Sequence, residues 1–173
     1  MDRGPCSVVR AGSVVLLALV VGATAGGCRS VSVTRDELLR SHTVEVHLVG
    51  VNRAEYRQWH DIPMDDYWKP SCQLRKQAVA QGYARVMVFR ESVPEEKVLE
   101  ATDPIWKEVW QARKAEDLFV LADLTGNIQK GAGSADARRK IHPLAPWPPL
   151  GRLSVRVGPG GIVLQNPRAG ERK

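Results

Sequence analysis

The chain has 173 residues, with 25 Lys and Arg against 19 Asp and Glu, which gives a formal net charge of +6 at pH 7. The two signs are interspersed along the chain, whereas a nucleic-acid-binding protein usually concentrates its basic residues in one stripe, so we expect no nucleic acid as a partner. The length is enough to bury one hydrophobic core, and we predict a single globular domain.

Residues 1–27 have the order of a secretory signal peptide. Arg3 and Arg10 make the head positive, an apolar run covers residues 14–21, and small residues then lead to Cys28. This run is shorter than the roughly 20 apolar residues that a transmembrane helix needs. The segment AGGC that ends at Cys28 resembles the lipobox of bacterial lipoproteins, with Ala25 where that family usually has Leu.

The lipobox resemblance implies that lipid such as palmitate is attached to the Cys28 thiol and that the leader is removed before it. The residue directly after Cys28 is Arg29. An Asp at that position resembles an inner-membrane retention signal, and this chain lacks it. We therefore expect a lipoprotein that is anchored in the outer membrane through acylated Cys28 and faces the periplasm. A plain signal peptide, cleaved near Ala25, is the alternative.

Alternation of apolar and polar residues predicts the strands. In residues 43–51 (TVEVHLVGV) Glu45 and His47 share the polar face, so we expect a half-buried strand with a solvated His47. Residues 118–124 (LFVLADL) are the most apolar and are predicted to be central. The remaining strands are predicted at residues 85–91 and in a hairpin over residues 153–164.

Capping residues and helical spacing predict three helices. Asn52 is the expected N-cap of a helix that ends near His60, and Gly82 closes a helix over residues 72–81. Asp103 and Pro104 open a helix over residues 104–116. Its Trp106 and Trp110, one turn apart, are expected to pack on the sheet. The other segments are predicted to be a turn at 64–67, a polar connection or helix at 94–101, a long mobile loop at 125–140 and an extended stretch at 141–149.

These elements predict an α+β fold, a small antiparallel β-sandwich-like domain with one or more helices packed on the sheet. One antiparallel sheet is expected to contain all the predicted strands, with the helix over residues 104–116 laid across it. The predicted organisation is a lipidated N-terminal tether with one short helix at 28–42, a globular domain at 43–165 and a flexible tail at 166–173.

No motif of a known catalytic or metal site is present. An acid-rich group could supply oxygen ligands, but nothing in its spacing makes the side chains converge, so we expect a solvated loop, no metal and no cofactor. This group consists of Glu55, His60, Asp61, Asp65 and Asp66. After cleavage Cys72 has no disulfide partner and is expected to be a small buried residue. The basic run at 138–140 is expected to be solvated, with contact to anionic head groups as the alternative.

Several segments together resemble the outer-membrane lipoprotein of type VI secretion systems. They are VEVHLVGV, LFVLADL, the basic stretch RKIHPL, a proline-rich break and LSVRVGPGGIVL, with the strongest similarity over residues 138–164. The resemblance implies a small β-sandwich with an added helix, which anchors a trans-envelope complex by binding the periplasmic end of an inner-membrane component. We therefore expect a non-enzymatic assembly and docking protein. The alternatives are a ligand-binding module with an aromatic cleft and a hydrolase of an unrecognised kind.

Four aromatic residues lie within thirteen positions in a chain that is only 6% aromatic. They are Tyr56, Trp59, Tyr67 and Trp68, and they are interleaved with charged residues. Interface hot spots combine aromatic and polar groups in this way, so we predict that these four residues and Trp147 bind a partner or ligand. The alternative is that the rings plug an open edge of the sheet.

Overall fold

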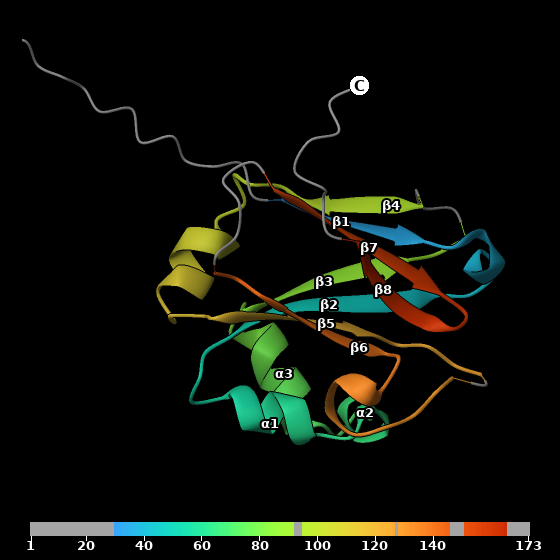
Figure 1. Cartoon of the computed structure of the whole chain (residues 1–173), viewed down its shortest axis with the longest axis horizontal. Helices are drawn as coiled ribbons and strands as arrows, with labels where there is room; N and C mark the ends of the chain where they lie inside the picture. Colours follow the sequence, from blue (N-terminus) through green and yellow to red (C-terminus); the bar gives the residue numbers. More distant parts are fainter. Residues whose placement is uncertain (1–29, 92–94, 127, 146–150, 166–173) are drawn as a thin grey trace, which may run out of the picture.

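The computed structural model describes residues 30–91, 95–126, 128–145 and 151–165. The predictions for the leader and Cys28, for Trp147 and for the tail concern residues outside this part. Two four-stranded sheets face each other, and three helices cover the outer face of one of them (Figure 1). This arrangement agrees with the predicted α+β sandwich. No helix in the part of the chain that is described has the length and apolar character needed to cross a membrane.

The central sheet has the strand order β3-β2-β5-β6 and is antiparallel throughout. Its strands are β2 (Val44–Val51), β3 (Ala84–Phe89), β5 (Asp117–Ala122) and β6 (Arg139–Pro143). Because layers cover both of its faces, consecutive residues such as Leu48 and Val49 of β2 are equally buried. The prediction of a half-buried strand with a solvated His47 is wrong, since His47 has no exposed surface.

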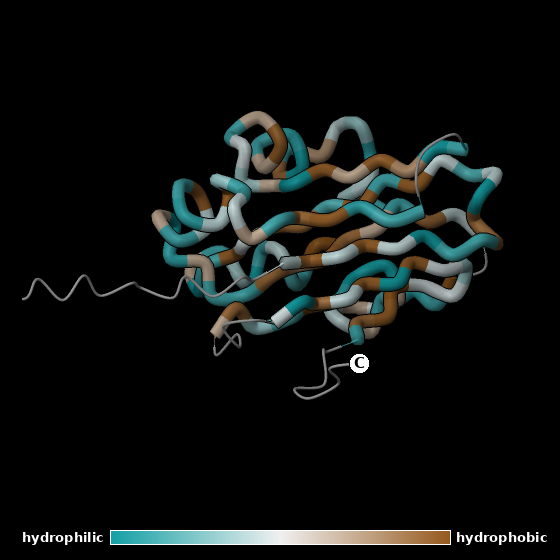
Figure 2. The backbone as a smooth tube through the Cα atoms, turned by 90° about the horizontal axis from the view of Figure 1, so that it is seen from above, coloured by the Kyte–Doolittle hydropathy of each residue, from teal (hydrophilic) through white to brown (hydrophobic). Residues whose placement is uncertain are grey.

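The outer sheet has the strand order β4-β1-β7-β8. Its strands are β1 (Ser30–Arg35), β4 (Glu96–Leu99), β7 (Arg152–Gly158) and β8 (Gly161–Gln165). Only its inner face is covered, so burial alternates along β7, where Leu153, Val155 and Val157 point into the core. Figure 2, seen from above, shows this alternation of hydrophobic and hydrophilic residues along the strands.

Three sequence predictions for the sheets are wrong. The residues assigned to a tether contain β1, and the polar connection contains β4. The hairpin formed by β7 and β8 belongs to the outer sheet and pairs in parallel with β1, so the strands do not form one antiparallel sheet. β1 buries Val31 and Val33 on its inner face, and Ser32 on the other face is buried beside Glu96, to which it donates a hydrogen bond. β4 and β7 pair with β1 from both sides and stabilise it.

Helices α1 (Tyr56–Asp61), α2 (Met64–Tyr67) and α3 (Gln73–Ala80) form a layer on the outer face of the central sheet (Figure 1). Asn52 accepts a hydrogen bond from the backbone N–H of Glu55 (3.0 Å), as its predicted capping role requires, although α1 itself begins four residues later. Gly82, at φ +72°, follows α3 in the left-handed conformation that favours glycine.

The predicted helix over residues 104–116 is a shorter π-helix, η2 (Ile105–Gln111). Trp110 is buried and packs on Gly50 of β2, where a Cβ atom would overlap the indole ring. The indole N–H of Trp110 donates to the carbonyl oxygen of Tyr83 (2.8 Å). Trp106 contacts the Trp110 ring edge to face and stays partly exposed, so only one of the two tryptophans is a full core residue.

Candidate functional site

The aromatic segment packs mainly into the core. Trp59 and Tyr67 are 1% and 0% exposed, and they contact each other and the central sheet, with the Trp59 ring 6.3 Å from Phe119. Tyr56 is partly buried against the same phenylalanine. The structure therefore brings these rings together between the helices and the sheet face, and it leaves Trp68 as the member that lines an open cleft.

The cleft beside Trp68 has a volume of about 460 Å³. One wall is the turn between α2 and α3, which supplies Trp68, Lys69 and Pro70. The other wall is the segment after β5, with Asp123, Leu124, Thr125, Gly126, Ile128, Lys130 and Arg138. The lining therefore combines an indole and a short apolar floor with two exposed lysines, each paired with an aspartate, and it also includes Asp65 and Asp123.

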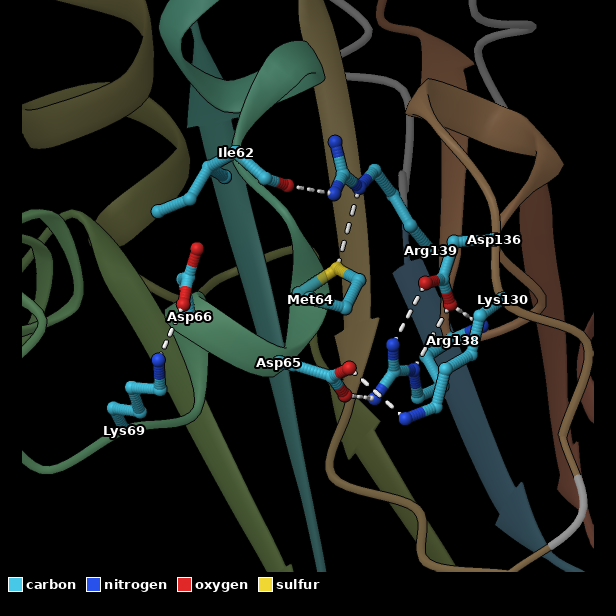
Figure 3. Close-up of polar contacts among 9 residues, drawn as sticks. All are labelled: Ile62, Met64, Asp65, Asp66, Lys69, Lys130, Asp136, Arg138 and Arg139. Carbon is cyan, nitrogen blue, oxygen red and sulfur yellow. Dashed lines mark hydrogen bonds and ion pairs between the residues drawn. The ribbon is translucent and has the colours of Figure 1, made fainter.

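Arg138 ties the two walls together (Figure 3). Its guanidinium donates through Nε and Nη2 to Asp136 (2.9 and 2.8 Å) and through Nη1 to Asp65 of α2 (2.6 Å). Lys130 donates to the second oxygen of Asp65 (2.9 Å). The hydrogen bond from Arg138, followed by that from Lys130, lowers the pKa of Asp65 to about 2. Burial opposes ionisation of Asp136, but the bonds from Arg138 hold its pKa below the ordinary value.

Arg139 is fully buried and points toward α1 (Figure 3). Its Nη1 donates to the carbonyl oxygens of Trp59 (2.9 Å) and His60, and its Nη2 donates to that of Ile62. These carbonyls lie at the C-terminal end of α1, where helices leave acceptors unsatisfied and favour positive charge. Its Nε contacts the sulfur of Met64 (3.2 Å).

The segment over residues 125–140 is thus built into the domain. The predicted long mobile loop is wrong, because it contains η3 (Gly133–Ala135), buried Asp136 and the two buried arginines. The prediction that the basic run is solvated, and the alternative that it meets head groups, are also wrong for Arg138 and Arg139, which are 5% and 0% exposed. Lys140 is partly exposed. Asp136 lies two positions before Arg138, but Asp65 and the carbonyl acceptors of Arg139 lie 73 to 80 positions away, so no local pattern indicated those contacts.

His47 supports Trp68 from beneath. Its Nδ1 lies 2.7 Å from the Tyr67 hydroxyl and its Nε2 lies 2.6 Å from Glu45, while its ring meets the Trp68 ring with centroids 5.0 Å apart. Burial lowers the pKa of His47 despite the opposing effect of Glu45. In the neutral ring Nε2–H donates to Glu45 and the Tyr67 hydroxyl donates to Nδ1, so both nitrogens are satisfied.

Arg75 also contacts Trp68. The guanidinium carbon lies 5.5 Å from the centre of the Trp68 ring, and Nη1 donates to the Trp68 carbonyl oxygen (3.1 Å). A cation held near an indole ring contributes about 0.5–1 kcal/mol at exposed sites. These contacts restrict the orientation of the Trp68 ring.

The acid-rich group disperses into separate pairs. Glu55 binds Arg113 (2.6 Å), Asp61 binds His60 (2.7 Å), and Asp66 binds Lys69 (2.6 Å). Asp65 belongs to the Arg138 network. Within the described ranges no three His, Cys, Asp or Glu side chains are grouped as metal ligands would be. Cys72 is partly buried at the start of α3, where its sulfur accepts a weak hydrogen bond from the backbone N–H of Arg75.

No family model and no curated protein matches the sequence. Among solved structures, a chain of the "Type VI membrane complex" superposes with a TM-score of 0.50 and 9% identity, over 80% of this chain and 98% of the other. A structure titled "T6SS protein TssM C-terminal domain" from EAEC has a TM-score of 0.47 and 11% identity over 80% and 97% of the two chains. The T6SS lipoprotein TssJ1 from Pseudomonas aeruginosa superposes with a TM-score of 0.47 and 14% identity, over 84% of this chain and 99% of the other.

These likenesses concern the fold. At 9% identity and a TM-score of 0.50, the match to the membrane-complex chain shows a similar overall fold. The resemblance to the type VI secretion lipoprotein family, which the sequence segments indicated, is confirmed at the level of the fold: the chain has a sandwich like that of a type VI membrane-complex component.

Proposed function

We propose that the protein is a lipid-anchored envelope protein that acts as a non-enzymatic docking component of a membrane complex of the type VI secretion kind. The observation that carries the proposal is the fold likeness to a chain of such a complex, which extends over 80% of this chain and 98% of the other. The AGGC segment ending at Cys28 adds a lipid attachment site. The proposed location is the outer membrane, with the domain in the periplasm.

The proposed docking surface is the cleft beside Trp68. Trp68 is the residue of the aromatic segment that lines this cleft, and its ring contacts His47 and Arg75. Lys69 and Lys130 stand at the rim, each paired with an aspartate of α2. The partner in this proposal is the periplasmic end of an inner-membrane protein, which inserts an apolar side chain against the indole.

Two experiments on the full-length protein test the proposal. Wild type and Cys28→Ser are grown with a palmitate analogue, and we expect label on the wild type alone. Equal label on both proteins would contradict the anchor. For docking, Trp68→Ala is compared with Trp106→Ala, a matched truncation of a partly exposed tryptophan outside the cleft. We expect Trp68→Ala to stay folded, with a small fall in the thermal unfolding temperature from the lost ring contacts, and to lose recovery of the inner-membrane partner from solubilised membranes.

The outcomes separate the candidate functions. Trp106→Ala should keep partner recovery, and loss of recovery in both variants would argue against a defined cleft. If Trp68→Ala unfolds the domain, or leaves both stability and recovery unchanged, the cleft is not the docking site. A ligand-binding module is the second candidate, favoured by the volume of the cleft, and it predicts that a small molecule rather than a membrane protein co-purifies with the wild type.

A further inference from the structure

The first strand begins almost at the proposed lipid attachment site. Arg29 alone separates Cys28 from Ser30, the first residue of β1. Two residues of chain span about 7 Å when fully extended. Ser30 is fixed in the outer sheet, because it pairs with Arg152 of β7 and donates its N–H to the Gly151 carbonyl oxygen (3.3 Å). An acyl chain on Cys28 therefore leaves the folded domain no tether.

We infer that the protein rests against the bilayer with the end of the sandwich at which β1 begins, and that Trp106 lies at the lipid headgroup layer. This inference rests on the proposed lipidation of Cys28 and adds to it an orientation and a contact surface. It also differs from the prediction of a lipidated tether with one short helix over residues 28–42, because that stretch contains a strand of the domain itself.

Hydrogen bonds place Trp106 beside this end. Leu99, the last residue of β4, pairs with Val31 of β1, so Glu100 lies next to Ser30. The indole N–H of Trp106 donates to the Glu100 carbonyl oxygen (2.9 Å). Neighbouring strands are about 4.8 Å apart, so the indole is within roughly 10 Å of the point where the chain leaves for Cys28. In Figure 1 η2 is the yellow helix at the end where β1 starts.

The surface at this end has the chemistry of a membrane interface. Trp106 is partly exposed and Lys107 is exposed. A groove of about 430 Å³ adjoins them, lined largely by apolar side chains that include Trp110 and Leu144. Indole rings favour the headgroup layer, and lysine side chains extend along apolar surface to the phosphates. Exposed Glu100 and Glu108 lie nearby, so the acyl chains and the indole determine the contact rather than net charge.

The same geometry directs the Trp68 cleft away from the membrane. β2 follows β1 after a short connection and therefore begins where β1 ends, and antiparallel β5 ends where β2 begins. The cleft residues Asp123 and Thr125 come directly after β5, and the N–H of Asp123 donates to the Glu45 carbonyl oxygen near the start of β2 (2.8 Å). The length of strands β1 and β7 separates the two ends of the sandwich by about 17–20 Å.

The test uses the lipidated full-length protein, with Cys72→Ser to remove the other thiol. A fluorophore is attached through Lys107→Cys at the proposed contact or through Pro159→Cys, an exposed position in the turn after β7. The proteins are reconstituted into vesicles of phosphatidylethanolamine and phosphatidylglycerol that contain a nitroxide on a headgroup. We expect the label at position 107 to lose most of its emission and the label at position 159 to keep most of its own.

A third protein carries a Gly/Ser linker of about 20 residues between Arg29 and Ser30, which spans roughly 25 Å on average. We expect it to reduce quenching at position 107 to the value at position 159. Quenching that survives the linker would overturn the role of the missing tether. Equal quenching at the two positions in a protein that floats with the vesicles would overturn the orientation alone. A protein that carries no lipid and does not float would overturn the proposed anchor and the inference with it.

Discussion

The two sheets of this domain differ in how many of their faces are covered by other layers. The central sheet is covered by the outer sheet on one face and by α1, α2 and α3 on the other, so β5 buries Leu118 to Ala122 without interruption. The outer sheet is covered on its inner face alone, and Arg152, Ser154 and Arg156 of β7 stand on its uncovered face. The two middle strands of the first sheet, β2 and β5, carry no exposed residue, whereas β7 of the second sheet carries polar residues on its uncovered face.

This difference also separates two kinds of ion pair. Arg138 and Asp136 are 5% and 1% exposed and connect β6 to the helical layer through Asp65. Arg156 and Asp36 form a pair at the end of the outer sheet, and the arginine side chain is 61% exposed. Water can replace the partner of an exposed charge but cannot reach a buried one. Substitutions in the central part of the molecule should therefore cost much more than equivalent ones in the outer sheet.

The largest expected effect comes from Trp110→Ala. The ring is 1% exposed, fills the space above Gly50 and donates to the Tyr83 carbonyl oxygen, so its removal leaves a cavity and an unpaired acceptor. We expect a loss of about 3–5 kcal/mol in the free energy of unfolding, measured by urea denaturation. Trp106→Ala, at a partly exposed ring, should cost clearly less. Equal shifts in the two midpoints would mean that η2 does not pack as described.

Arg138→Ala should have the next largest effect. It leaves the buried carboxylate of Asp136 without its charged partner and frees Asp65 from the β6 side of the cleft. Breaking a buried pair in this way costs about 3 kcal/mol or somewhat more. The matched control, Arg156→Ala, removes an exposed pair and should cost less than about 1 kcal/mol. Similar losses for the two arginines would contradict the contrast between the sheets.

A fall in pH should destabilise the central region through His47. Burial holds its folded-state pKa below the unfolded value of about 6.5, so the folded protein binds fewer protons than the unfolded chain. The contribution of His47 is fully present above pH 6.5 and is lost as the pH falls through the folded-state pKa. The slope should not exceed about 1.4 kcal/mol per pH unit for one proton.

The variant His47→Gln isolates this contribution. Glutamine keeps a donor and an acceptor but does not titrate. Between about pH 7.5 and pH 5, on either side of the ordinary histidine pKa, the free energy of unfolding of the variant should therefore change less than that of the wild type. Glu45 faces His47 from the same strand, Tyr67 from α2 and Arg75 from α3, and all three are kept in the variant. Parallel curves for the two proteins would show that another group causes the acid sensitivity.

The smallest effect is expected on the uncovered face of the outer sheet. Val163 of β8 is 54% exposed, and Val163→Thr should change the free energy of unfolding by less than about 0.5 kcal/mol. The same substitution at Val120 of β5, which has no exposed surface, places a hydroxyl in the core and should cost about 1–3 kcal/mol. Thermal unfolding of the two variants compares the sheets directly, and equal melting temperatures would argue against the difference between them.

Much of the strand pattern could be predicted from the sequence. β2, β3, β5 and the hairpin of β7 and β8 lie where alternation or apolar runs indicated strands, because both signals arise from residues that are neighbours in the sequence. β1 and β4 were missed because short segments of small or charged residues resemble linkers. Their stability comes from partners in the sheet, and partner strands cannot be read from a local pattern.

The candidate site was predictable only in part. Local composition identified the aromatic segment and Trp68, since rings and charges rarely mix so densely in one stretch. It could not separate the buried Trp59 and Tyr67 from the cleft-lining Trp68, because burial depends on which layer covers each ring. His47, Arg138 and Arg139 looked solvated for the same reason: their partners Tyr67, Asp65 and the end of α1 lie 20 to 80 positions away.

The sequence by itself determined the elements whose cause is local: alternating strands, the Asn52 and Gly82 caps, and the leader-like segment that ends at Cys28. Only the tertiary structure decided which faces are covered, where the buried arginines find acceptors and how close β1 starts to Cys28. The physical reason is that backbone preference and hydrophobic period act over a few residues, whereas burial and charge pairing are decided by contacts between distant segments.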